Sequence, residues 1–119
     1  MSLLNLASER CAACRPGAPA ATLQEQAEWL AALPGWSLRE ENGMPVLVRL
    51  YRCQDFSAAL VCAQAIGALA DAADHHPRLV VEWGRLEVSW WTHVIGGLHR
   101  NDFIMAARTE TAVAAHGGV

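Results

Sequence analysis

Apolar residues recur at helical spacing in three segments of the chain. In the first segment, Thr22 and Glu25 fit a capping box, in which each side chain satisfies a free backbone N–H at the start of a helix. Pro34-Gly35 would end this helix. Its expected apolar face consists of Leu23, Ala27, Leu30 and Ala31.

The second and third helical segments are longer. Asp55 is a suitable N-cap for the second helix. This helix should end near Ala73, because Pro77 biases His76 towards extended backbone. Its expected apolar stripe consists of Phe56, Leu60, Ala63, Ile66 or Gly67, Leu69 or Ala70, and Ala73. A third helix is expected from about Arg100 to Ala114.

Between the helices, β-rich segments and turn residues predict two hairpins. The four expected strands cover residues 36–39, 46–52, 79–82 and 85–93. Asn42-Gly43 turns the first hairpin, since both residues tolerate positive φ, and Trp83-Gly84 turns the second. In the last strand, Leu86, Val88, Trp90 and Thr92 alternate with Glu87, Ser89, Trp91 and His93. The order α-β-β-α-β-β-α predicts an α+β domain in which three helices cover one face of a four-stranded antiparallel sheet.

Composition indicates one globular domain behind an N-terminal arm. Of the 119 residues, 53% are hydrophobic and 18% are charged, which excludes a disordered chain. Residues 1–21 are expected to be an arm, because residues 15–21 carry two prolines and a glycine, and residues 22–119 would form the domain. The net charge of −3 gives no basic surface for nucleic acid. All nine cations are arginine, so Schiff-base chemistry on lysine is also excluded.

The four cysteines are expected to be thiols in a reducing cytoplasm. No secretory signal precedes them and no stretch approaches ~20 apolar residues, so neither export nor a membrane span is predicted. Cys11 and Cys14 have half the spacing of a zinc site, but no second C-x-x-C completes it. Cys62 is interpreted as a small core residue.

Candidate chemistry gathers where histidines and aspartates lie close in sequence. Four of the five histidines fall between residues 75 and 99, and the acidic residues around them are Asp71, Asp74 and Asp102. A histidine titrates near pH ~6.5, so it can give and take protons near neutrality, and a neighbouring carboxylate can fix its tautomer. His75, His76 and His93 are therefore candidates for proton transfer. Two other interpretations stay open: zinc binding by these three histidines, and an ordinary structural role.

The five tryptophans divide into expected packing residues and candidates for ligand stacking. Trp29 and Trp36 flank the first helix, and Trp90 alternates with apolar residues, so all three should pack. Trp83 lies at a tight turn and Trp91 lies on the opposite strand face from Trp90, where either could stack on a flat heteroaromatic ligand. A subunit interface is the alternative for Trp91.

One constellation in this region resembles a known family. Its members, in order, are Asp71, His75-His76-Pro77, Trp83, His93 and Asp102. With their spacing they resemble the signature of the pterin-4a-carbinolamine dehydratases, and residues 90–93 and 97–107 are similar to the bacterial branch. The likeness extends from about residue 22 to 110. It implies the same α-β-β-α-β-β-α order that the hydrophobic pattern predicts.

The resemblance implies a hydro-lyase that needs no metal and no cofactor. The family dehydrates 4a-hydroxytetrahydropterin to quinonoid dihydropterin, which recycles the cofactor of aromatic amino-acid hydroxylases. By resemblance, His75 and His93 would transfer protons and His76 would chiefly hold the pterin. Asp71 would orient a histidine, and Asp74 could share that task. The remaining expected substrate contacts and supporting residues are Pro77, Trp83, Thr92, Val94, Ile95 and Asp102.

The resemblance also implies partners. The family forms dimers and tetramers by joining sheet edges and packing long helices, so a homodimer or homotetramer is expected, and an aromatic amino-acid hydroxylase is a further candidate partner. The alternative function is a non-catalytic dimerisation cofactor on the same scaffold, which the presence of all three histidines disfavours. One departure concerns Asn101, which stands directly before Asp102 where some members have arginine; here Arg100 lies one position earlier.

Overall fold

The computed structural model describes residues 6–8 and 19–119, so the predictions for Cys11 and Cys14 lie outside the described residues. The helices are η1 (Leu6–Ser8), α1 (Leu23–Ala31), α2 (Phe56–Ala73), η2 (His93–Ile95) and α3 (Arg100–Ala115). The strands are β1 (Ser37–Glu41), β2 (Met44–Arg52), β3 (Arg78–Glu82) and β4 (Arg85–Trp90). The α-helices and strands follow one another in the predicted order.

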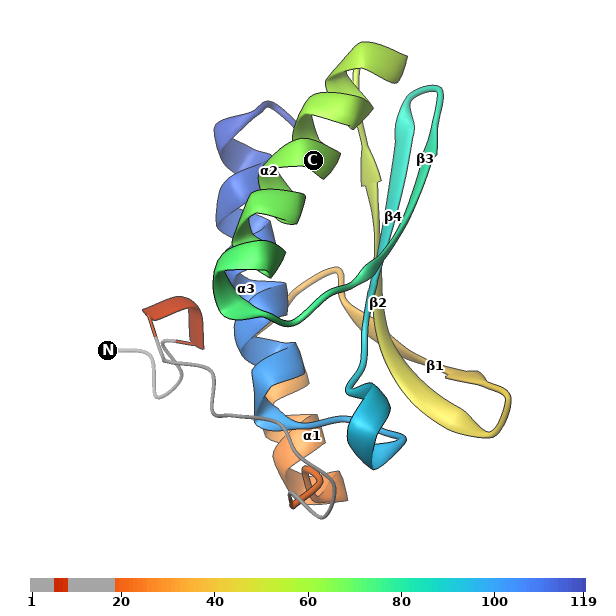
Figure 1. The fold of residues 1–119 in the computed structure, drawn as a ribbon, viewed down its shortest axis with the longest axis vertical. Coiled ribbons are helices and arrows are strands. Elements are labelled where there is room, and N and C mark those ends of the chain that lie inside the picture. Colours follow the sequence, from red (N-terminus) through yellow and green to blue (C-terminus); the bar gives the residue numbers. More distant parts are fainter. Residues whose placement is uncertain (1–5, 9–18) are drawn as a thin grey trace.

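The four strands form one antiparallel sheet in the order β1-β2-β4-β3. Both predicted hairpins are present. Asn42 and Gly43 take positive φ (52° and 76°) in the first turn, and Gly84 (71°) does so in the second. Figure 1 shows the three α-helices on one face of the sheet, which confirms the predicted α+β architecture.

Both predicted helix N-caps are present. Thr22 Oγ1 accepts a hydrogen bond from the Glu25 backbone N–H at 3.1 Å, and Glu25 Oε1 accepts one from the Thr22 N–H at 2.9 Å. At the start of α2, Asp55 Oδ1 accepts from the Ala58 N–H at 2.8 Å. These side chains satisfy backbone donors that the helices leave free.

The core lies between the sheet and the helices. Leu86, Val88 and Trp90 of β4 are fully buried, as their alternation predicts. They belong to one cluster with Phe103 and Met105 of α3. The indole N–H of Trp90 donates to Thr109 Oγ1 at 3.1 Å, so the polar atom of this buried ring is satisfied. The other two tryptophans predicted to pack, Trp29 and Trp36, are buried as well.

The apolar face predicted for α1 is wrong in three of its four positions. Leu23 is 84% exposed. The other exposed members are Ala27 and Ala31. The buried residues of the helix are instead Gln26 and Trp29. The indole of Trp29 packs on the ring of Phe103, with 5.2 Å between the ring centroids. A buried indole removes more apolar surface from water than Leu23 would, and it therefore sets the rotation of the helix.

The apolar stripe predicted for α2 is confirmed at Ile66 and Ala70 and is wrong in the first turns of the helix. Phe56 and Leu60, which were expected to pack, are exposed. The buried residues of α2 are Ala59, Cys62, Ile66 and Ala70. Three of these four side chains are small, which lets the helix lie close to the layer beneath it. Cys62 is thus a small core residue, as predicted.

The C-terminal boundary of β4 differs from the prediction. The strand ends at Trp90 and not at His93. Thr92 instead forms an isolated bridge with Gly97, in which the Thr92 N–H donates to the Gly97 carbonyl at 2.8 Å. His93 therefore lies in η2, outside the strand.

Part of the predicted N-terminal arm packs on the domain. Leu6 is buried in the core cluster. The Ala7 carbonyl accepts a hydrogen bond from Arg108 Nε of α3 at 3.0 Å. The short helix η1 therefore lies against α3 and contributes to the core.

Candidate active site

A buried histidine–carboxylate pair forms the centre of the candidate site. His75 Nε2 lies 2.7 Å from Asp102 Oδ1, and both side chains are withdrawn from solvent. His75 follows directly after α2, and Asp102 lies in the first turn of α3. The pair therefore joins the end of one helix to the start of another.

The end of α2 explains how His75 reaches the interior. Asp74 caps the helix in the left-handed conformation (φ 50°, ψ 44°), which reverses the chain. The His75 N–H then donates to the Ala70 carbonyl at 3.1 Å. Asp74 is exposed, and its carboxylate makes no hydrogen bond or ion pair with a histidine in the described part of the chain. The structure thus gives Asp74 a backbone role.

Three donors hold the fully buried carboxylate of Asp102. Besides its contact with His75, it accepts hydrogen bonds from Thr92 Oγ1 at 2.8 Å and from the His99 backbone N–H at 2.9 Å, both on Oδ2. Its place in the first turn of α3 also puts it near the positive end of the helix dipole. The carboxylate is therefore fixed in position and compensated for its burial.

The imidazole of His75 is oriented on two sides. Its ring stacks on the indole of Trp90, with centroids 5.5 Å apart and planes 11° from parallel. Asp102 occupies Nε2, so Nδ1 is the ring nitrogen left for another partner. The side chain of His75 is only 9% exposed, so the ring lies in a largely water-excluded setting.

His99, to which the sequence pattern assigns no role, contacts the buried carboxylate. It is the N-cap of α3: its Nδ1 accepts a hydrogen bond from the Asn101 N–H at 3.0 Å, and its own N–H donates to Asp102. Burial lowers the pKa of His99, and the charge of Asp102 opposes that shift only in part. Its position three residues before Asp102 was the available signal, since it matches the spacing of a capping box.

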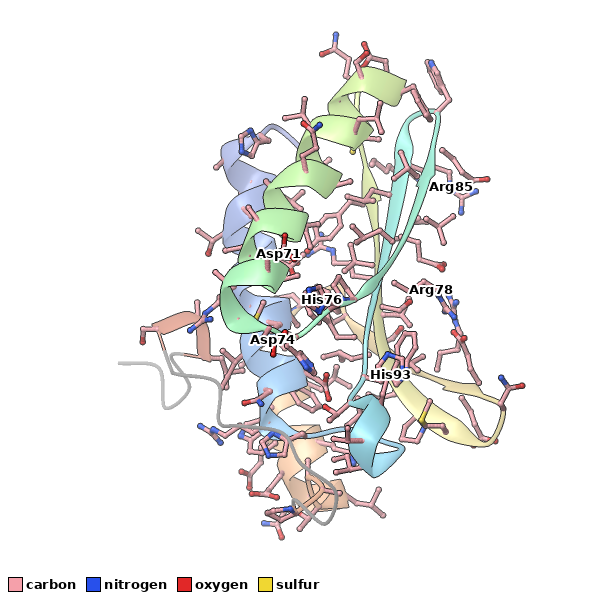
Figure 2. The ribbon with its side chains drawn as sticks, in the orientation of Figure 1. Asp71, Asp74, His76, Arg78, Arg85 and His93 are labelled. Atoms are coloured by element: carbon pink, nitrogen blue, oxygen red, sulfur yellow. The ribbon has the colours of Figure 1, made fainter. Side chains whose placement is uncertain are left out.

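His76 and Asp71 form a second, exposed pair beside the buried one. His76 Nε2 lies 3.0 Å from Asp71 Oδ1 across the end of α2. Pro77 follows and is half-buried where the chain enters β3. Figure 2 shows Asp71, Asp74 and His76 together at this connection. The structure thus pairs Asp71 with His76 and pairs Asp102 with His75.

His93 lies on η2, just beyond the end of β4. It is exposed, and its ring lies 4.8 Å from the ring of Trp91. The guanidinium of Arg78 lies 5.3 Å above the same indole and is fixed by Glu41, which accepts its hydrogen bond at 2.6 Å. The other residues of η2, Val94 and Ile95, are exposed and half-buried respectively.

The structure brings most of the expected residues to one region, but not Trp83. Thr92 touches Asp102 directly, and His93 follows Thr92 in the chain. Trp83 lies in the β3–β4 turn, and His93 lies beyond the other end of β4. The extended strand between them is roughly 20 Å long. Arg100 points to α1, where its guanidinium lies 4.7 Å from the ring of Trp29.

The geometry can support proton transfer. A buried, oriented imidazole with a carboxylate partner stands next in sequence to an exposed imidazole, His76, and a third exposed imidazole, His93, follows Thr92. Among residues 6–8 and 19–119, no three or more histidine, cysteine, aspartate or glutamate side chains are grouped as metal ligands. Imidazoles beside carboxylates can act as general acids and bases.

Comparisons with known proteins show which proteins this chain is similar to. The model of the pterin 4 alpha carbinolamine dehydratase family matches residues 19–112. A Gloeobacter violaceus protein with a provisional pterin-4-alpha-carbinolamine dehydratase designation is 47% identical over 98% of this chain and all of its own length. A Microcystis aeruginosa protein so designated is 44% identical over 91% of this chain and 93% of its own. A Brucella melitensis crystal structure, described as a transcriptional coactivator/pterin dehydratase, has a TM-score of 0.72 and 28% identity, covering 80% of this chain and 99% of that one.

Proposed function

This chain belongs to the pterin 4 alpha carbinolamine dehydratase family, and we propose that it converts 4a-hydroxytetrahydropterin to quinonoid dihydropterin and water by histidine acid–base catalysis. The observation that carries the proposal is the buried pair of His75 and Asp102 with His76 and His93 near it in the chain. A merely structural histidine needs neither a carboxylate with three donors nor two exposed imidazoles close by.

The reaction requires two proton transfers. The C4a–O bond breaks, and the leaving oxygen takes a proton from a general acid to depart as water. N5 loses its proton to a general base, and the C4a–N5 double bond forms. The proton given and the proton taken balance, so no oxidant, reductant or metal is needed.

The histidines divide naturally between these tasks. His75 and His93 are the proposed proton-transfer groups. His75 is fixed by Asp102 and Trp90 so that Nδ1 can face the substrate, whereas His93 is exposed and can exchange protons with water. His76, held by Asp71, would chiefly bind the pterin.

The first test is turnover. Purified, metal-stripped protein is added to chemically generated 4a-hydroxytetrahydropterin, and the ultraviolet decay is followed. We expect clear acceleration, and a loss of at least tenfold in rate for His75→Ala and for His93→Ala, since a proton-transfer group contributes ~10²–10⁴-fold. Folded variants that keep the full rate would falsify the assignment of the two histidines.

The alternative is a non-catalytic binding function on the same scaffold. The description of the Brucella melitensis protein includes a transcriptional coactivator, which favours keeping this candidate. A folded protein that does not accelerate the dehydration, yet retains an aromatic amino-acid hydroxylase or a regulator in a pull-down, would establish it in place of the enzyme.

Self-association is the second part of the proposal. Within the described residues, α2 alone has the length and mean hydropathy (1.5) of a membrane span, and 22% of it is buried. Its exposed apolar residues are Phe56, Leu60 and Val61. An exposed apolar surface of this kind is typical of a protein–protein interface. In a homodimer or homotetramer, α2 of a second copy would bury it. The cytoplasm remains the proposed location.

A further inference from the structure

A cavity lies away from His75, His76 and His93, at the other end of β4. Its volume is about 640 Å³, within the usual range for small-molecule sites. Among its lining residues are Leu50, Arg52, Gln54, Trp83 and Arg85. Figure 2 shows Arg85 on the side of the sheet away from the helices. The dehydration chemistry makes no use of this cavity.

Two arginines line the cavity, and neither forms a strong ion pair with a side chain in the described part of the chain. Arg52 of β2 and Arg85 of β4 stand directly opposite in the strand register, an arrangement that like charges disfavour. Arg85 has a weak, exposed contact with Glu82 at 3.8 Å, and Arg52 has no ion pair with the described residues. No acidic residue lines the cavity. In a chain with net charge −3, the lining of this cavity is locally basic.

Apolar surface lies beside the two guanidinium groups. Trp83 is 72% exposed, and Leu50 is 45% exposed. An indole left this open contributes little to folding, since the benefit of a tryptophan comes from burying its ring. Together Trp83 and Leu50 offer a flat aromatic surface and an apolar floor next to the cations.

The backbone around the cavity is fixed in advance. The Cys53 N–H donates to the Gly84 carbonyl at 2.9 Å, which ties the end of β2 to the β3–β4 turn. Arg52 exchanges two hydrogen bonds with Val119, at 2.7 and 3.0 Å. A ligand would therefore meet a backbone that is already ordered, which lowers the cost of binding.

We propose that this cavity binds a small aromatic anion. The anionic group, a phosphate or a carboxylate, would lie between the guanidiniums of Arg52 and Arg85, which bind planar or tetrahedral anions through several N–H donors. The ring would stack on the indole of Trp83. Both features are required at once, so a bare anion or a neutral ring should bind less well.

The test is calorimetric titration of the full chain with phenyl phosphate, and with benzoate to distinguish the two anionic groups. Inorganic phosphate and cyclohexyl phosphate serve as probes that lack an aromatic ring. We expect phenyl phosphate or benzoate to bind at one site. Arg52→Gln, Arg85→Gln and Trp83→Ala should each weaken binding at least tenfold.

Arg39→Gln is the matched control, because Arg39 is an exposed arginine of the same sheet that does not line the cavity. It should leave the affinity unchanged. Circular dichroism checks that each variant is folded, and Arg85→Gln replaces Arg52→Gln should the latter not fold. Absent binding, equal affinity for cyclohexyl phosphate, or equal losses in Arg39→Gln would each overturn the proposal. Amide shifts confined to residues 50–54 and 82–85 would support it independently.

Discussion

At the scale of single residues, Asp102 ties together three parts of the chain. It accepts hydrogen bonds from the side chain of Thr92 and the backbone of His99, and it holds His75. A buried carboxylate is costly unless its oxygens are fully hydrogen-bonded, and here they are. The same bonds that stabilise the charge therefore fix the imidazole.

Replacing this carboxylate tests both effects together. In Asp102→Asn, the amide N–H₂ must either face the two donors at Oδ2 or force Nε2 of His75 to become an acceptor, so we expect a loss of about 1–3 kcal/mol in the free energy of unfolding. We also expect at least a tenfold slower dehydration, because His75 loses its charged partner. Urea denaturation and the ultraviolet assay measure the two quantities.

Asp71→Asn is the control for that experiment. Asp71 also pairs with a histidine, but its side chain is 83% exposed. An exposed pair contributes only ~0–1 kcal/mol, so the stability should hardly change. Equal destabilisation by the two substitutions would contradict the importance given to burial at Asp102.

The pKa of His99 gives a pH dependence of known sign. Burial lowers this pKa in the folded state, so the native protein favours the neutral ring while the unfolded chain binds a proton more readily. Its contribution to stability is present above the ordinary histidine pKa and is lost as the pH falls through the folded value.

His99→Asn checks this expectation, because asparagine is also a good N-cap. The variant should lose less stability than the original chain between pH 7 and pH 5, and the difference in slope should be less than about one proton. The measurement is the free energy of unfolding at a series of pH values. Parallel curves for the two proteins would show that His99 does not titrate differently on folding.

At the scale of elements, one carboxylate of α3 fastens the helix to the sheet. Glu110 Oε1 accepts hydrogen bonds from Trp36 Nε1 at 2.8 Å and Tyr51 Oη at 2.6 Å, and it also pairs with Arg49. Burial and the neighbouring Glu110 carboxylate raise the pKa of Tyr51, so the phenol stays a donor at any ordinary pH.

Glu110→Gln should therefore weaken the attachment of α3. The amide can accept fewer of the three bonds and removes the charge beside Arg49, so we expect a loss of about 1–2 kcal/mol in unfolding free energy. Glu82→Gln is the control, because Glu82 has only an exposed contact at 3.8 Å with Arg85. Denaturant midpoints compare the two, and equal small losses would contradict the role of Glu110.

The sequence predicts the helices and strands better than it predicts which face of a helix packs on the core. Caps, turns and alternation are local signals, and they place every α-helix and strand in the right order. The rotation of α1 depends on a partner far along the chain, the Phe103 ring against Trp29, and the sequence pattern does not reveal this contact. Hydrophobic spacing alone favoured Leu23, which lies in solvent.

In the candidate site, too, the sequence indicates individual residues but not their contacts. The resemblance supplies His75 and Asp102 as individual residues, but they lie 27 positions apart, and their contact follows only from the fold. The role of His99 depends on the exact start of α3. Trp83 shares the signature yet lies at the far end of β4, since sequence proximity within a hairpin does not imply a common site.

At the scale of the whole molecule, α2 presents apolar surface on the side that the monomer does not cover. If a second copy covers it, Leu60→Gln should shift the sedimentation mass from a multiple of 12.9 kDa towards the monomer. Leu23→Gln is the control, because Leu23 is still more exposed but lies on α1. A single 12.9 kDa species for the unmodified chain at micromolar concentration would contradict self-association.

The bridge between Thr92 and Gly97 makes the segment that carries His93 a small closed loop. Such a loop can open while the sheet remains intact, because only the bridge and η2 must break. Yet the Thr92 hydroxyl also bonds to Asp102, so any opening that displaces Thr92 frees one of the carboxylate's donors and loosens His75. Displacing the segment that carries His93 would therefore also loosen His75, although the two imidazoles lie on separate segments of the chain.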